Sequence, residues 1–332
     1  MNLAWGPVAA GIAAWLCTRW LVRASPRRLQ DRPNRRSLHQ APVPRSGGVA
    51  VVLAIGLGWI VAGLVPGTPL PWAGAALCAA LGLGDDWRGL GVLPRLLGQG
   101  AAAGLALAAT GVPELLSLPG MDAALPGMGI LSLIFLLWMV NLYNFMDGMD
   151  GFAGGMGVVG FGSLALAGLW AGAADFAAAA AVVAAAAAGF LVFNRPPARI
   201  FLGDAGSTTL GLLAGSFGLW AEAADILPLW ATVLIFAAFV VDASATLVRR
   251  LLHGEAVWVA HRKHVYQCLV RLGWGHRRTV HREYLVMLAT AASALWAAGS
   301  PAPVQWAVLA GWGLFFAAVI AWTWSRCPWQ ES

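Results

Sequence analysis

The sequence has few charged side chains, and this scarcity excludes an ordinary soluble domain. Asp, Glu, Lys and Arg make up 11% of the 332 residues, against about 25% in a typical soluble protein. Lysine occurs once, at Lys263, so arginine supplies almost all of the positive charge. Hydrophobic residues reach 59%. The composition therefore predicts an integral membrane protein that forms one domain over residues 1–332.

Cysteines are also few, and none is placed for a disulfide. Cys17 and Cys78 lie within apolar stretches, whereas Cys268 and Cys327 lie outside them among basic residues, so no pair suits an oxidising compartment. No basic residue precedes the first apolar stretch, and arginines follow it, which reverses the charge order of a secretory signal. We expect this stretch to remain as a helix.

Eleven apolar stretches predict an all-α, polytopic protein with about eleven membrane-spanning helices. Most of them are close to the ~20 residues that cross a bilayer core. They cover roughly residues 3–22, 47–65, 70–84, 96–112, 128–146, 152–172, 176–193, 205–224, 226–248, 284–299 and 303–325.

The charges fall on opposite sides of this arrangement. With the N-terminus outside, the inward side holds all 21 Lys and Arg residues, and the outward connections hold only acids, namely Glu114, Asp122, Asp175, Glu222 and Asp225. The positive-inside rule then predicts an outside N-terminus and an inside C-terminus, with the site facing the cytoplasm. The net charge of +6 favours anionic lipid over nucleic acid as its partner.

Polar side chains with catalytic character occur only in the inward segments, which we expect to form the site. These segments are residues 23–46, 85–95, 144–151, 194–204 and 249–282.

The first two segments offer a glycine pair and an acid pair. Gly47 and Gly48 follow a proline-rich loop and let a ligand approach the backbone, although a basic loop of this kind can also anchor to lipid headgroups. Asp85 and Asp86 are adjacent, so one carboxyl has a raised pKa or both face a cation; the alternative is a pair of solvated loop carboxylates. Arg95 is near enough in sequence to reach the same site.

Five more polar residues end or begin apolar stretches. Asn141, Asn144, Asp147 and Asp150 recur every three residues, which predicts neighbours on one helical flank that faces a cavity. A helix cap would explain one of them but not four. Asp204 precedes an apolar stretch between glycines, where it can cap a helix or hold Mg²⁺ beside a bound phosphate.

The last inward segment contains His261, Arg262 and His264, which suit an oxyanion because Arg forms bidentate contacts with phosphate and His donates a further hydrogen bond. Zinc is an alternative, since Cys268 follows at a usable spacing, but no clear fourth ligand is present. An amphipathic interfacial segment over 265–280 is a further interpretation.

The order of motifs PRSGG, GDD, NLYNFMDGMDG, NRPPARIFLGDAGS and HRKH resembles the polyprenyl-phosphate N-acetylhexosamine-1-phosphate transferases, from about residue 32 to 282. The pattern looks like the bacterial branch that starts O-antigen or related surface glycans. The peptidoglycan branch, which stays the alternative, typically has Met where Arg45 stands and three histidines in the last loop. Asp242 departs from the family pattern because no proline precedes it.

The resemblance implies that undecaprenyl phosphate attacks a UDP-N-acetylhexosamine and releases UMP. It places Mg²⁺, with Mn²⁺ as an alternative, on Asn144 and Asp204. The residues implied to be catalytic are Asp85, Asp86, Asp204 and His264. Those implied to bind substrates are Gly47, Gly48, Arg95, Asn141, Asp147, Asp150, His261 and Arg262. Asp85 is either a general base or a group that positions the carrier phosphate. The chain is also compatible with a homodimer.

Two other classes of membrane protein fit less well. A phosphatidyltransferase would carry an Asp-Gly-x-x-Ala-Arg signature with downstream aspartates, which the sequence lacks. A transporter would place ionisable residues near the bilayer midplane, whereas here nearly all lie at the inner ends of the apolar stretches.

Overall fold

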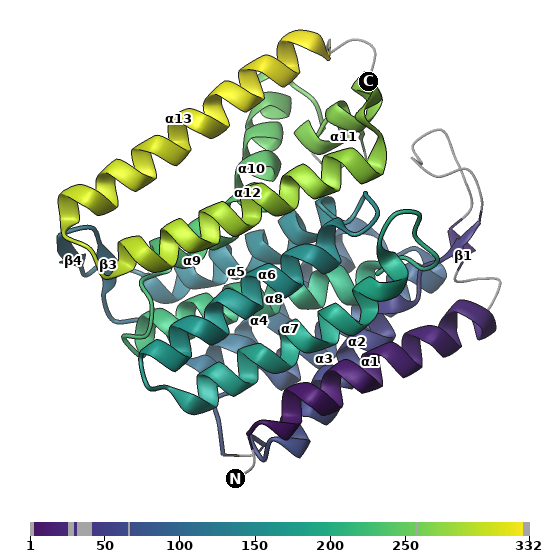
Figure 1. The fold of residues 1–332 in the computed structure, drawn as a ribbon, viewed down its shortest axis with the longest axis horizontal. Helices are drawn as coiled ribbons and strands as arrows, with labels where there is room; N and C mark the ends of the chain where they lie inside the picture. The colour runs from purple at the N-terminus through teal and green to yellow at the C-terminus, as the bar shows by residue number, and fades with distance from the viewer. Residues whose placement is uncertain are drawn as a thin grey trace.

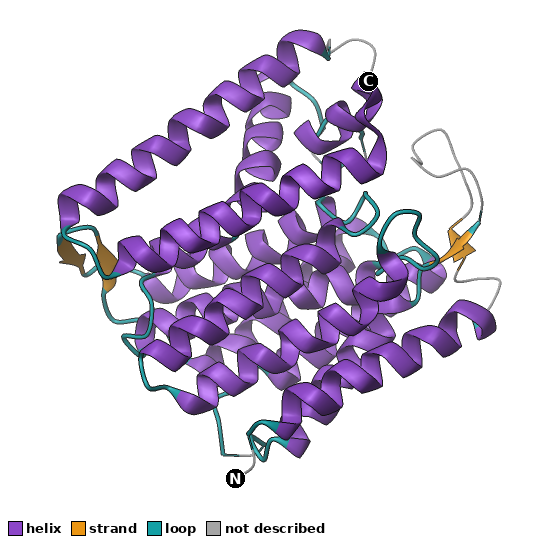
Figure 2. Cartoon of the chain, viewed as in Figure 1, coloured by secondary structure: helices purple, strands orange, loops and turns teal. Residues whose placement is uncertain are grey.

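The computed structural model describes residues 3–25, 30–31, 42–65, 67–256, 258–259 and 261–327. In these ranges the chain is mostly helical, as predicted, with two short antiparallel hairpins (Figure 2). Strand β1 (Gln30–Asp31) pairs with β2 (Val43–Pro44), and β3 (Leu116–Leu118) pairs with β4 (Met121–Ala123). Much of the predicted inward segment 23–46, namely 26–29 and 32–41, lies outside the described residues.

The helices follow one another through short connections. They are α1 (Trp5–Ala24), α2 (Gly47–Val61), α3 (Trp72–Arg88), α4 (Val92–Thr110), α5 (Met128–Phe145), α6 (Phe152–Trp170), α7 (Ala174–Asn194), α8 (Asp204–Ala223), α9 (Leu229–Ile235), α10 (Ala237–Leu252), α11 (Val265–Leu269), a π-helical turn (Val270–Trp274), α12 (Gly275–Ala298) and α13 (Ala302–Arg326).

Helix α8 forms the centre of the bundle and is buried along nearly its whole length. It packs against α3 and α5, while α7 packs between α1 and α6 (Figure 1). Small residues make these close contacts possible: a Cβ built on Gly189 of α7 would lie 2.4 Å from the carbonyl oxygen of Gly11 on α1. The alanine-rich stretch 177–189 thus packs closely against neighbouring helices.

The C-terminal part departs from the predicted spans. The stretch 226–248 is not one helix, because α9 and α10 meet at Phe236 with a bend of 85°. Helix α12 begins at Gly275, well before the predicted stretch 284–299. Helix α13 runs along the outer side of α10–α12 and stands apart from the main bundle (Figure 1).

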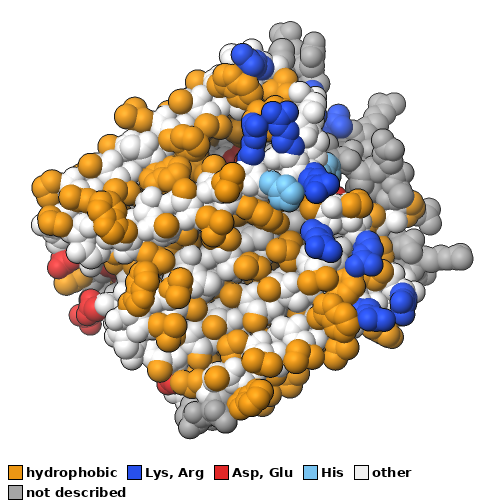
Figure 3. Space-filling model, in the orientation of Figure 1, with side chains coloured by type: hydrophobic (Ala, Val, Ile, Leu, Met, Phe, Trp, Pro, Cys, Tyr) orange, Lys and Arg blue, Asp and Glu red, His pale blue; other side chains and the backbone are white. Residues whose placement is uncertain are grey.

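Within the described residues, α4, α5, α6, α7 and α13 are each long and apolar enough to cross a membrane, and the bent pair α9–α10 would add a sixth. The protein is therefore a multi-pass membrane protein, and eleven spans and their orientation stay predictions. On the face shown in Figure 3, Lys and Arg side chains gather at one end of the molecule, and the acidic side chains that project furthest lie toward the other end.

Candidate active site

A cavity of about 670 Å³ opens between α4, α5, α10 and the loop before α11. Its polar lining is contributed by Arg95, Asn141, Asn144, His261, His264 and Gln267. The remaining lining is apolar and includes Leu96, Ile134, Leu137, Trp138 and Leu247. The cavity therefore combines a polar end with an apolar wall, which suits a ligand that is part phosphate and part hydrocarbon.

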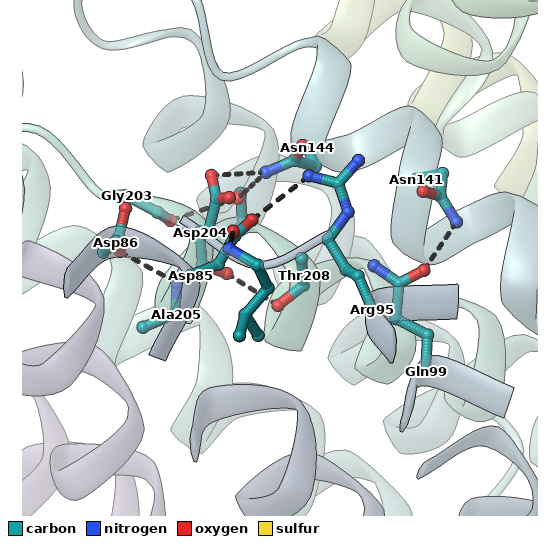
Figure 4. Close-up of polar contacts among 12 residues, drawn as sticks. Asp85, Asp86, Arg95, Gln99, Asn141, Asn144, Gly203, Asp204, Ala205 and Thr208 are labelled. Atoms are coloured by element: carbon teal, nitrogen blue, oxygen red, sulfur yellow. Dashed lines mark hydrogen bonds and ion pairs between the residues drawn. The ribbon is translucent and has the colours of Figure 1, made fainter. Parts of the chain in front are cut away.

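Two carboxyl groups lie close together beside this cavity, although the helices that carry them are far apart in the sequence (Figure 4). Asp85, in the last turn of α3, and Asp204, the first residue of α8, are hydrogen-bonded to each other through their side chains. Arg95 Nη1 lies 3.1 Å from Asp85 Oδ2, and Asn144 Nδ2 donates to Asp204 Oδ1 at 2.9 Å. The predicted convergence of α3, α5 and α8 residues is thus present.

The pKa values of Asp85 and Asp204 shift in opposite directions because the two carboxyls have different neighbours. Burial opposes the ionisation of Asp85, but hydrogen bonds from Asp204, the Leu90 amide and Arg95 outweigh it and lower its pKa. Burial and the neighbouring Asp85 raise the pKa of Asp204, which Asn144 offsets only in part. Because the pKa of Asp204 is raised only to about 6, both carboxyls are mostly ionised at neutral pH, and their two adjacent charges favour a bound cation.

Asp86, which follows Asp85 in the sequence, is likewise not among the residues that line the cavity. Asp86 is 3% exposed, and its Oδ2 accepts a 3.4 Å hydrogen bond from the Ala205 amide. Arg45 donates to its carbonyl oxygen and brings Nε to 3.6 Å from its carboxylate. Burial and the charge of Asp204 raise the pKa of Asp86 to about 7. Asp86 therefore ties α3 to the start of α8.

Glycine is required at this junction. Gly203 has φ +73°, and a Cβ there would lie 2.3 Å from the carbonyl oxygen of Arg45. The helix begins directly after it, and Asp204 makes no capping hydrogen bond. The N-cap interpretation of Asp204 is therefore wrong, and its carboxyl is available to the site.

The glycine pair contacts protein backbone in this structure. The Gly47 and Gly48 amides donate to the carbonyl oxygens of Phe201 and Leu202 at 3.0 and 2.7 Å. A Cβ on Gly48 would lie 2.2 Å from the Gly206 nitrogen. The protein's own segment 201–206 makes the close approach seen here, and the approach of a ligand to this glycine pair stays a prediction.

The four polar residues around the end of α5 do not share one helical flank, because α5 ends at Phe145. Asn141 bonds to Gln99 on α4 at 3.0 Å and lies apart from the carboxyl pair (Figure 4). Asp147 follows the helix, and burial together with the charges of Asp204 and Asp86 raises its pKa.

Asp150 faces the loop 194–200 and the start of α12. It accepts a hydrogen bond from the Ala198 amide at 3.0 Å and lies 3.1 Å from His276 Nδ1. Both contacts engage its carboxylate oxygens, so in this structure Asp150 holds the loop beside the site.

The histidine loop is positioned by a buried acid on α10. Asp242 Oδ1 lies 3.2 Å from His264 Nδ1 and accepts from the Thr246 hydroxyl and the Val265 amide; Oδ2 accepts from the Tyr266 amide. An acceptor at Nδ1 selects the tautomer that is protonated there. The Nε2 of His264 then remains for the cavity that this residue lines.

A second acid, Glu255, holds the other residues of the histidine loop in place through ion pairs. Glu255 pairs with Arg250 at 3.0 Å and with Lys263. Burial and the charge of His264 lower the pKa of His261 to about 3, so this imidazole is neutral at physiological pH. Arg262 is half-buried and is not among the residues that line the cavity.

The donors fit Mg²⁺ better than zinc. In the part of the chain that the structure describes, no three His, Cys, Asp or Glu side chains are grouped to hold a metal, and Cys268 is hydrogen-bonded to Cys327. The zinc alternative is therefore wrong. Asp204 and Asn144 supply a carboxylate and an amide, oxygen ligands that Mg²⁺ uses together with phosphate and water.

Two site residues were missed by sequence reasoning. Arg45 clamps Asp86, and Gln99 orients Asn141. Gln99 lies four residues after Arg95, so helical spacing was the available signal. Arg45 belongs to the PRSGG motif, but nothing local in the sequence indicated its partner Asp86, which is 41 residues away.

Residues 69–222 match the family model for glycosyl transferase family 4. The chain is 28% identical over 265 residues to a probable undecaprenyl-phosphate N-acetylglucosaminyl 1-phosphate transferase of Bacillus subtilis, covering 77% of this chain and 74% of the relative. It is 28% identical over 335 residues to a decaprenyl-phosphate N-acetylglucosaminephosphotransferase of Mycolicibacterium smegmatis, covering 84% and 78%. A phospho-N-acetylmuramoyl-pentapeptide-transferase of Synechococcus is 34% identical over 228 residues, covering 63% and 64%.

Proposed function

Because the chain belongs to glycosyl transferase family 4, we propose that it transfers an N-acetylhexosamine 1-phosphate from a UDP-sugar to undecaprenyl phosphate. The protein is a membrane enzyme of the polyprenyl-phosphate N-acetylhexosamine-1-phosphate transferase type. An oxygen of the carrier phosphate attacks the β-phosphorus of the donor, the bond between the two donor phosphates breaks, and UMP leaves.

One observation carries this proposal: Arg95 and Asn144 line the polar end of a cavity whose wall is apolar, and these two side chains contact the neighbouring acids Asp85 and Asp204. Phosphoryl transfer requires chiefly alignment and charge neutralisation of two anionic reactants. The apolar wall suits the polyprenyl chain, and the polar end suits the two phosphate groups.

Asp204 and Asn144 would hold Mg²⁺, with Mn²⁺ as an alternative. A divalent ion there supplies charge that neutralises the donor pyrophosphate. It would also offset the repulsion between the neighbouring carboxylates of Asp85 and Asp204.

Arginine and histidine side chains beside the acids would bind the phosphate groups of the two substrates. Arg95 lies on α4 against Asp85 and lines the cavity, so it can contact both the acid and a phosphate. His264 would donate to the pyrophosphate, and the neutral His261 beside it adds a second imidazole 4.8 Å away between ring centroids. A phosphate monoester with a second pKa of ~6 is mostly dianionic at neutral pH, so Asp85 positions the carrier more than it deprotonates it.

The site is proposed to face the cytoplasm from the bacterial inner membrane and to start an O-antigen type of surface glycan. The positive-inside rule supports the orientation, because the arginines gather at one end of the molecule (Figure 3). A homodimer is compatible with this arrangement.

The test is the identity of the nucleotide product. Purified protein is incubated with undecaprenyl phosphate, Mg²⁺ and β-³²P-labelled UDP-N-acetylhexosamines, with Asp204→Asn as the matched inactive control. We expect UMP, and label in the organic phase. UDP as the product, with label left in water, would contradict the proposal.

A second donor belongs in the same panel because the Synechococcus relative is a phospho-N-acetylmuramoyl-pentapeptide-transferase. Turnover of UDP-N-acetylmuramoyl-pentapeptide in place of the simple hexosamines would assign the chain to the peptidoglycan branch. Turnover of the simple hexosamines alone supports the surface-glycan assignment.

A further inference from the structure

Helix α13 lies beside the bundle without packing tightly against it. Of its 25 residues, all within the described range, only Thr323 is buried. The helix is fixed near both ends: Trp306 Nε1 donates to the Pro119 carbonyl oxygen at 3.2 Å, and the Arg249 guanidinium lies 4.2 Å from the Trp324 ring centroid. Between these contacts the side of α13 that faces α10 is not filled by protein.

Two cavities of about 580 and 430 Å³ occupy this space, each within the usual size of a small-molecule site. They share Val241 of α10 and Phe316 of α13, so they form one furrow along the helix, here called the α13 furrow. Apolar residues dominate its walls. They include Leu116, Leu118, Leu234, Val240, Leu269, Val286, Leu309, Phe315 and Ile320.

One end of the α13 furrow carries a cluster of arginines on tryptophans. Arg282 and Arg278 lie 4.2 and 5.0 Å from the ring centroid of Trp274, and Arg326 lies 4.5 Å from that of Trp322. The two rings are 6.0 Å apart, and Arg282, Trp274 and Trp322 line the cavity. Tryptophan and arginine side chains grouped in this way are typical of the membrane–water interface.

Two acids also line this end, and neither cancels the arginine cluster. Asp242 is engaged by Thr246 of α10 and by three donors at the start of α11. Glu283 is the remaining carboxylate, against the three guanidinium groups of Arg278, Arg282 and Arg326. The local balance therefore favours an anion.

We propose that the α13 furrow binds an anionic phospholipid, with an acyl chain between α13 and α10 and the phosphodiester against Arg282 and Arg326. Arginine forms strong charge-assisted hydrogen bonds with phosphate oxygens, and the apolar walls remove an acyl chain from contact with water or disordered lipid. The furrow shares no lining residue with the active-site cavity. It is therefore a site for a structural lipid and not a path for the substrate.

The test is native mass spectrometry of the full-length, delipidated protein titrated with phosphatidylglycerol or phosphatidylcholine. We expect tighter retention of phosphatidylglycerol. The double variant Arg282→Gln with Arg326→Gln should bind phosphatidylglycerol about tenfold more weakly, since each lost contact is charge-assisted. Arg19→Gln is the matched control, because Arg19 also lies over a tryptophan, Trp15, but on α1.

The apolar part is tested by Val286→Phe, which narrows the furrow, against Leu288→Phe, which changes an exposed residue of the same helix. Only the first should reduce retention of both lipids. Elution profiles and melting temperatures establish that each variant is folded. Equal retention of the two lipids by the wild type, equal loss in Arg19→Gln, or displacement of phosphatidylglycerol by undecaprenyl phosphate would overturn the proposal.

Discussion

Replacing Asp242 by Asn should slow the reaction by releasing His264. The carboxylate accepts hydrogen bonds from Thr246, His264, Val265 and Tyr266. Asparagine keeps one acceptor oxygen and places an NH₂ group against donors. Because the Val265 and Tyr266 amides are fixed in a helix, the mobile partner is the imidazole of His264.

The size of the effect follows from the bond that is lost. A hydrogen bond to a charged acceptor contributes roughly 1.5–3 kcal/mol. If this loss falls on the transition state, kcat/KM decreases by about 10- to 150-fold. Thr246→Val is the matched control, since it removes one donor to Asp242 and keeps the shape and the charge; we expect a change of only a few-fold from it.

The assay is UMP release with a double-mutant cycle. Asp242→Asn should cost much less in a His264→Gln background, because the group that it positions is already absent. Equal costs in both backgrounds would refute the reasoning and assign Asp242 to folding alone. Melting temperatures of all four proteins separate loss of structure from loss of positioning.

Three further outcomes are expected. Asp204→Asn should keep the fold and lose most turnover, and near wild-type rates at limiting Mg²⁺ would reduce this residue to a structural role. Asp85→Asn should show a defect that is flat from pH 6 to 9 if Asp85 positions the carrier, whereas recovery at high pH would make it a general base. Glu255→Gln should lower the melting temperature at pH 7 by the equivalent of ~1 kcal/mol, because Glu255 pairs with Lys263 and Arg250 near the surface. Burial opposes ionisation of Glu255, but the two cations outweigh it and lower its pKa below 4.5, so its contribution is present above that pH and disappears as the pH falls through the lowered value; a difference that persists in acid would contradict this.

The sequence predicted where polar groups interrupt apolar helices, and this was sufficient to bring Asp85, Arg95, Asn144 and Asp204 together. These residues occupy helix ends, and helix ends are marked by local composition. The prediction of the helices failed where tertiary contacts determine the path of the chain. The bend at Phe236 has no proline or glycine beside it, so hydropathy alone reads 226–248 as one span.

Local sequence patterns also could not identify pairs of polar residues that are far apart in the chain. The partner of Asn141 is Gln99, 42 residues away, and that of Asp242 is His264, 22 residues away. The period of three from Asn141 to Asp150 suggested one flank, but a helix has 3.6 residues per turn and α5 ends at Phe145. The spacing therefore identified the polar segment 141–150 correctly, but it wrongly predicted that these residues share one side of a helix.

The meeting of α3 with α8 has a consequence for how the protein is made. The Ala205 amide that binds Asp86 is 119 residues further along the chain, so a growing polypeptide inserts α3 to α7 while its acid pair has only the nearby Arg45, Leu90 and Arg95 as partners. A ribosome adds about 5–20 residues each second, which leaves these carboxyls without α8 for several seconds. Insertion machinery or lipid headgroups must shelter them during that interval, and nascent chains truncated before Asp204 are expected to be early targets of membrane proteases.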